Sequence, residues 1–166
     1  MMKKILISLF AGGVLGVAVG FALGIFVYPF WFLTDVAMEQ VSDRDLRTVA
    51  AAGKFVHANP SDPVHWGKGS VTIFEEAGNG WLLHLEQDFE VGPGPRFHVY
   101  LVANANVQDN ADFKNSETVD LGRLKAFKGG QSYAVASDLD LARYKSVVIW
   151  CKEFGVLISP ATLVTS

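Results

Sequence analysis

A run without any charged residue, from Ile5 to Phe32, constrains this chain more than any other feature. About 20 apolar residues are enough for a helix to cross the hydrocarbon core of a bilayer, and this run is longer. Lys3 and Lys4 precede it, and such a cationic end stays in the cytoplasm. The sequence predicts a single-pass anchor in the inner (cell) membrane over residues 1–33, with the rest of the chain periplasmic or extracellular.

A cleaved signal peptide is the alternative to an uncleaved anchor. Signal peptides have a shorter apolar core that ends in a small-x-small cleavage site. Here the apolar run continues through Val27–Phe32, and Asp35-Val36-Ala37 matches a cleavage site poorly. We therefore expect the anchor to be retained, with Tyr28 and Trp31 at the outer membrane interface.

Four glycines recur every four residues along this run, at Gly12, Gly16, Gly20 and Gly24. In a helix they share one face, and small-xxx-small spacing lets two helix backbones approach closely in lipid. This predicts a helix–helix partner, either a second copy or another protein. The alternative is that glycine is simply common in membrane helices.

Residues 34–52 are polar and alanine-rich and are predicted to form a stalk or linker, with Ser42 as the cap of a short helix. From Gly53 the pattern changes to short alternating apolar segments separated by Gly, Pro, Asn and Asp. Residues 53–166 are therefore predicted to be an all-β domain, an antiparallel β-sandwich or partly open barrel. The expected strands are 54–57, 70–75, 81–86, 97–102, 119–124, 132–135, 146–152 and 156–158, with a surface loop over 103–117.

Composition excludes several classes of function. The whole chain has a net charge of −3, and its part after the apolar run is more acidic still, so nucleic acid is not an expected partner. The single cysteine, Cys151, excludes an internal disulfide. No nucleophile–base motif, phosphate loop or metal-ligand spacing occurs, so no metal site is predicted and no enzyme class is assigned.

The four histidines give only weak signals. His84 and His98 have the opposite strand parity to their apolar neighbours, which favours solvated side chains. His57 and His65 flank a proline-rich turn and are expected to approach one another. Asp109, Asn110, Asp112 and Asn115 are arranged somewhat like a calcium loop, but the required Gly and closing Glu are missing.

Cys151 lies near the end of the most concentrated β-branched and aromatic run, Val147–Trp150. Strand parity places it with Val147 and Ile149 on an apolar face. One interpretation is a packed thiol that acts as a small hydrophobe. The other is a working thiol, because Lys152 is a neighbouring cation that favours the thiolate and because an exported compartment oxidises unprotected thiols.

The residues around Cys151 and several earlier segments together resemble a known family. The segments are Gly53-Lys54-Phe55, His65, Gly69-Ser70-Val71, Asp88-Phe89, Gly94-Pro95, Val99-Tyr100-Leu101, Leu121-Gly122-Arg123-Leu124-Lys125, Gly130-Gln131-Ser132-Tyr133 and Val148-Ile149-Trp150-Cys151-Lys152-Glu153-Phe154, followed by Ala161 and Leu163. In this order they resemble the electron transfer DM-thirteen domain. The resemblance covers Gly53 to Leu163.

This resemblance implies a compact β-domain with a role in extracytoplasmic electron transfer. The family's characteristic cysteine, at the position of Cys151, would act as a bare redox thiol or as a ligand to a prosthetic group such as haem. Arg96 departs from the family, which usually has an acidic residue after Gly94-Pro95. The DOMON or cytochrome segments that accompany the domain elsewhere are not found here, which implies a separate redox partner protein.

Two functions follow for the exported domain. The first is a redox or electron-transfer role centred on Cys151. The second is a non-enzymatic envelope binding or structural module in which Cys151 is a packed core residue.

Overall fold

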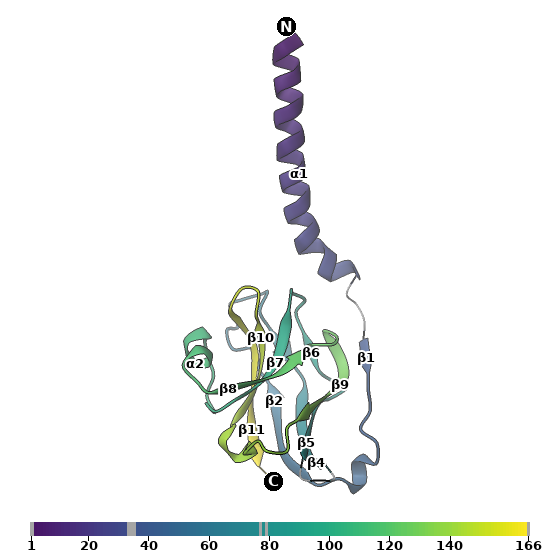
Figure 1. Ribbon diagram of the computed structural model, residues 1–166, viewed down its shortest axis with the longest axis vertical. Helices are drawn as coiled ribbons and strands as arrows, with labels where there is room; N and C mark the ends of the chain where they lie inside the picture. Colours follow the sequence, from purple (N-terminus) through teal and green to yellow (C-terminus); the bar gives the residue numbers. More distant parts are fainter. Residues whose placement is uncertain (1, 33–35, 77, 79, 166) are drawn as a thin grey trace.

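The computed structural model describes residues 2–32, 36–76, 78 and 80–165; within the first helix it describes the side chains of residues 9, 10 and 12–25. An N-terminal helix leads into a β body (Figure 1). The elements are α1 (Met2–Phe32), β1 (Val36–Met38), η1 (Arg44–Leu46), β2 (Val49–Phe55), β3 (Gly67–Lys68), β4 (Ser70–Glu76), β5 (Gly80–Leu85), β6 (Glu90–Val91), β7 (Phe97–Val102), α2 (Asn110–Lys114), β8 (Thr118–Arg123), β9 (Lys128–Val135), η2 (Leu141–Arg143), β10 (Ser146–Cys151) and β11 (Val156–Thr165).

The strands form one large open sheet in the order β3-β6-β9-β5-β4-β2-β11-β10-β7-β8, and β1 pairs with β9 outside this path. Among the described pairings only β1 with β9 is parallel. Register shifts at Val99/Tyr100 and Ile149/Trp150 are irregularities of the kind that bend a sheet. The predicted antiparallel β body is thus confirmed, but its strands join one open sheet, not the two separate sheets of a sandwich.

β10 is the most deeply buried strand, because all six of its residues are buried. Val147, Ile149 and Cys151 belong to the main hydrophobic core, as their parity predicts. Val148 and Trp150 point to the other face and belong to a second apolar cluster. The sheet thus buries β10 on both faces, and covering the second face requires a further element.

The cover is α2, a single helical turn inside the segment predicted to be a surface loop. Asp109 begins this turn by accepting hydrogen bonds from the backbone N–H groups of Ala111 and Asp112. Phe113 then packs on Trp150, with ring centroids 4.0 Å apart and planes nearly parallel. The predicted surface loop over 103–117 is thus irregular and largely exposed except at this turn, where one buried aromatic side chain ties the polar segment to the sheet.

The segment predicted as a stalk contributes strands to the sheet. β1 pairs with β9, and β2 starts at Val49, before the predicted domain boundary at Gly53. At Gly53 an added Cβ would lie 2.5 Å from the Thr162 carbonyl oxygen, so the small residue allows β2 and β11 to approach closely. The helix predicted to be capped by Ser42 is replaced by the 3₁₀ turn η1, which follows Asp43 without a side-chain cap.

The described apolar side chains of α1 are exposed, among them Phe10, Val17 and Phe21. Among the residues whose placement the structure describes, no helix reaches the length and apolar character that a membrane crossing requires. The predicted interface residues Tyr28 and Trp31 have side chains outside the described set.

Candidate functional site around Cys151

Cys151 is the last residue of β10, where it pairs with Phe97 of β7 and Val156 of β11. Its side chain is 1% exposed, and its Sγ atom donates a hydrogen bond to the Pro95 carbonyl oxygen at 3.2 Å. The strand ends there because a tight turn follows, in which Gly155 adopts a positive φ of 63°. The thiol is therefore held at the end of the sheet, with its hydrogen directed to a backbone oxygen.

A cavity of about 360 Å³ borders the cysteine. Its lining is mostly apolar and comes from the β6–β7 connection, the β10–β11 turn, the segment before β3 and one side chain of α1: Ile25, Val64, His65, Pro93, Gly94, Pro95, Phe97, Cys151, Phe154 and Val156. Phe154 and Val64 are exposed and border this cavity. Cys151 is buried but not sealed by packed hydrocarbon, which leaves room for a small molecule beside the thiol.

His65 is the one histidine that lines this cavity with Cys151. Its Nδ1 atom lies 2.7 Å from Oδ2 of Asp62. The same carboxylate accepts backbone hydrogen bonds from Val64 and His65. The His65 side chain, followed by these backbone N–H groups, lowers the pKa of Asp62 to about 2. The carboxylate is therefore ionised at neutral pH and fixes the orientation of the imidazole.

His65 had been expected only to approach His57 across the proline-rich turn. In the structure both histidines contact Asp62, because His57 Nε2 lies 2.7 Å from its carbonyl oxygen. The placement of His65 and Cys151 at the same cavity was missed, because the two residues are far apart in the sequence. The spacing of Asp62 and His65 was a usable signal, since an Asp side chain in a turn commonly binds groups two or three residues later.

His84 was predicted to be solvated, and that prediction was wrong. It is 2% exposed, with Nδ1 at 2.8 Å from Ser132 Oγ and Nε2 at 3.9 Å from Glu86. Burial lowers the pKa of His84, and the Glu86 charge offsets this only in part. The side chain has outward parity, but the segment around η1 lies over that face, where Arg44 pairs with Glu86 at 2.8 Å. His84 does not line the cysteine cavity.

His98 and Lys152 also lie away from the cavity and meet at Asp120. His98 Nδ1 is 2.9 Å, Lys152 Nζ 3.0 Å and the Tyr100 hydroxyl 3.0 Å from its carboxylate. Burial opposes ionisation of Asp120, but these hydrogen bonds and the backbone N–H of Gly122 together lower its pKa to about 2. Lys152 is thus engaged with a carboxylate, and the predicted assistance to the thiol from Lys152 has no counterpart in these contacts.

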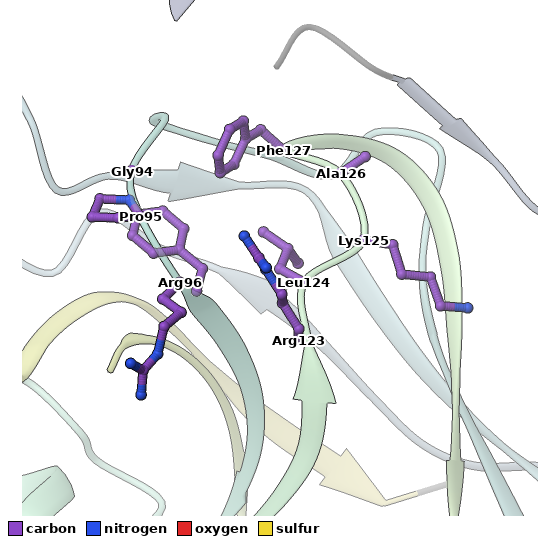
Figure 2. A pocket seen from close by; sticks show the side chains of 9 residues that line it. Gly94, Pro95, Arg96, Arg123, Leu124, Lys125, Ala126 and Phe127 are labelled. Atoms are coloured by element: carbon purple, nitrogen blue, oxygen red, sulfur yellow. The ribbon is translucent and has the colours of Figure 1, made fainter. Parts of the chain in front are cut away.

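Gly94, Pro95 and Phe97 also line a second cavity, of about 380 Å³, between residues 94–97 and 123–127 (Figure 2). In this view the guanidinium group of Arg123 points toward Gly94 and Pro95, whereas the side chains of Arg96 and Lys125 extend away from them (Figure 2). Arg96 has a positive φ of 52° and pairs with Glu153 at 3.1 Å. The two cavities therefore differ in charge, and the thiol belongs to the apolar one.

No group of three or more His, Cys, Asp or Glu side chains that could hold a metal ion occurs among the described residues. In the segment compared with a calcium loop, Asp109 instead caps α2, and Asn110 Oδ1 accepts a hydrogen bond from the Leu157 backbone N–H at 2.7 Å. At the cysteine cavity, the side chains that could ligate a metal ion are one thiol, Cys151, and one imidazole, His65.

Comparison with known protein families identifies a match. No curated protein and no solved structure matches the chain significantly. The family model described as Electron transfer DM13 matches residues 60–163, which include both His65 and Cys151. That match covers more than half of the sequence, and the chain belongs to the electron transfer DM13 family.

Proposed function

We propose that this protein is an extracytoplasmic electron-transfer domain whose redox site is the cavity beside Cys151. The observation that carries the proposal is the position of the thiol: it borders an apolar cavity together with the imidazole of His65, which the Asp62 carboxylate orients. A low-dielectric cavity strengthens the electrostatic effect of each polar group within it. His65 is the group in the lining that can accept a proton when the thiol or a bound molecule loses an electron.

A haem-type prosthetic group does not fit this cavity well. Small-molecule sites range from about 300 to 1,000 Å³, and a volume of about 360 Å³ suits one or two rings better than a porphyrin. The thiol hydrogen is also engaged with the Pro95 carbonyl. The electron-transfer proposal therefore rests on the thiol itself or on a smaller bound molecule, with a separate protein as redox partner.

The alternative is a tethered binding or structural module. Its support is the packing of Cys151, which is 1% exposed, belongs to the main core and has a hydrogen-bond acceptor for its thiol. In that case the cysteine contributes to stability alone.

Protein-film voltammetry of the full chain, with an absorption spectrum of the freshly purified protein, separates these functions. We expect a redox wave that Cys151→Ser abolishes. Val99→Ala is the matched control, because Val99 is fully buried in the same core and lines neither cavity. A wave that survives Cys151→Ser, or is lost equally in Val99→Ala, would leave the structural module as the better account.

We further propose that α1 anchors this domain to the inner (cell) membrane, with the N-terminus cytoplasmic and the domain periplasmic or extracellular. The support is the uncharged run from Ile5 to Phe32 and the exposure of its described apolar side chains. Carbonate extraction and protease protection test this. Release of the intact chain into the soluble fraction would contradict it.

A helix partner in the membrane is part of the same proposal. An added Cβ at Gly12, Gly16, Gly20 or Gly24 meets nothing within 4 Å, so this face is open to another helix. Gly16→Ile should weaken cross-linking between chains or to a different partner, whereas Val17→Ile, on a neighbouring position, should not.

A further inference from the structure

We infer that the Cys151 cavity binds the ring of a membrane hydroquinone, whose hydroxyl group donates a hydrogen bond to Nε2 of His65. This inference rests on the proposed electron-transfer function and names the class of ligand for the same site. It concerns binding of the ring and assigns no electron-transfer step to it.

The hydrogen-bonding capacity of His65 determines which ligand group the cavity can recognise. An ionised carboxylate only accepts hydrogen bonds, so the 2.7 Å contact with Asp62 requires the proton on Nδ1 of His65. In the neutral ring Nε2 is then an acceptor. This atom has no hydrogen bond to any described residue. A ligand that uses it must bring a donor, which a hydroquinone hydroxyl provides and a quinone carbonyl does not.

The other polar group at the cavity is already satisfied. Cys151 directs its thiol hydrogen to the Pro95 carbonyl oxygen, so the thiol donor is already used. The remaining lining comes from apolar groups such as Phe97, Val156 and Phe154. The cavity thus offers an apolar ring-sized space with one acceptor, and its volume of about 360 Å³ is at the lower end for small-molecule sites.

The position of the cavity favours a ligand dissolved in the membrane over one dissolved in water. The β10–β11 turn lies at the end of the β body that α1 approaches (Figure 1). Ile25 of α1 borders the cavity, and Val64 and Phe154, which also border it, are exposed. An apolar border beside the proposed anchor gives an isoprenoid hydroquinone a route that avoids bulk water.

Titration of the full chain in detergent micelles with a hydroquinone that carries one isoprenoid unit tests the inference. We expect saturable one-to-one binding, measured by calorimetry against empty micelles. The dimethyl ether of the same molecule has no donor and should bind about 5- to 10-fold more weakly, as expected for one lost hydrogen bond. The oxidised quinone should also bind more weakly than the hydroquinone, by a similar factor.

His65→Phe keeps a ring of similar shape and removes the acceptor, so it should weaken binding of the hydroquinone about 5- to 10-fold and leave binding of the ether unchanged. His98→Phe is the matched control, since His98 is paired with Asp120 outside the cavity. If His65→Phe does not fold, Val64→Glu places a charge at an exposed border position and should also weaken binding.

Three results would overturn the inference: no saturable binding, equal affinity for hydroquinone and ether, or equal weakening by His98→Phe. None of these results bears on the voltammetric wave of Cys151, because that wave is measured without added hydroquinone. If that wave is present and binding is absent, the ligand class is wrong and the electron-transfer proposal stands. If binding is present and the wave of the protein alone is absent, electron transfer by the thiol itself is ruled out, and the bound molecule is the remaining redox group of the site.

Discussion

The Sγ atom of Cys151 donates its hydrogen to the carbonyl oxygen of Pro95, 3.2 Å away on the neighbouring β6–β7 connection. This contact holds the thiol inside the body although a cavity lies beside it. We expect a charged thiol reagent to label the native chain about 100-fold more slowly than the unfolded chain, because access needs a local opening of about 3 kcal/mol. An uncharged aromatic reagent should react faster than the charged one, because the cavity is apolar. Equal native and unfolded rates would contradict this burial.

The buried His84 should make stability depend on pH in the mildly acidic range. Burial lowers the pKa of His84 below its usual 6.5, so the unfolded chain takes up a proton at a higher pH than the folded chain does. The free energy of unfolding should therefore fall as the pH drops below about 6.5. Denaturant titrations at pH 7.5, 6.0 and 5.0 measure this loss.

His84→Gln should flatten that pH dependence, because glutamine does not titrate and can still meet Ser132. His98→Gln is the control. His98 lies in β7, which four strands separate from β5 in the sheet, and it pairs with Asp120. If His84→Gln left the pH dependence of stability unchanged and His98→Gln removed it, the effect would come from His98, and the prediction for His84 would be wrong.

Asp120 should contribute to stability through the three side chains that meet its carboxylate. Its pKa in the folded protein is about 2, below the usual 3.8, so the contribution is present above pH 4 and is lost as the pH falls towards 2. About a third of the carboxylate side chain is exposed, so we expect Asp120→Asn to cost only about 1 kcal/mol at pH 7. The cost should shrink as the pH falls through about 2, where the Asp120 carboxylate becomes protonated. An equal cost at both pH values would indicate lost packing instead of lost charge.

The strands that carry Cys151 could be predicted because their signals are local. β10 is a dense β-branched and aromatic run, and its alternation alone places Val147, Ile149 and Cys151 on the core side. β4, β5 and β7 follow from similar short apolar runs between turn residues. β3 and β6 have two residues each and show no periodicity, so the sequence did not reveal them.

The surroundings of the thiol could not be predicted, because they depend on contacts between distant segments. His65 reaches the cavity only through the turn that Asp62 stabilises, and nothing near Cys151 in the sequence indicates it. His84 has the parity of an exposed residue and is buried because the segment around η1 lies over that face. Alternation reports which way a side chain points; whether another segment covers it is decided by tertiary packing.

α2 is the clearest case of such a cover, and Phe113 should be the residue that holds it in place. Its ring stacks on Trp150 at 4.0 Å and meets Tyr100 edge-on at 5.1 Å. Phe113→Ala removes both contacts and leaves the outer face of β10 uncovered, so we expect a loss of about 3 kcal/mol in the free energy of unfolding. The fluorescence of Trp150 should shift to longer wavelength as water reaches the indole. Lys114→Ala, on the same turn, should cost less than about 1 kcal/mol, because Lys114 is exposed and its ammonium group lies over the Trp150 ring only at 5.9 Å from the ring centroid. Equal free energies of unfolding for the two variants would contradict this role of Phe113, because the burial of Trp150 would then not depend on its ring.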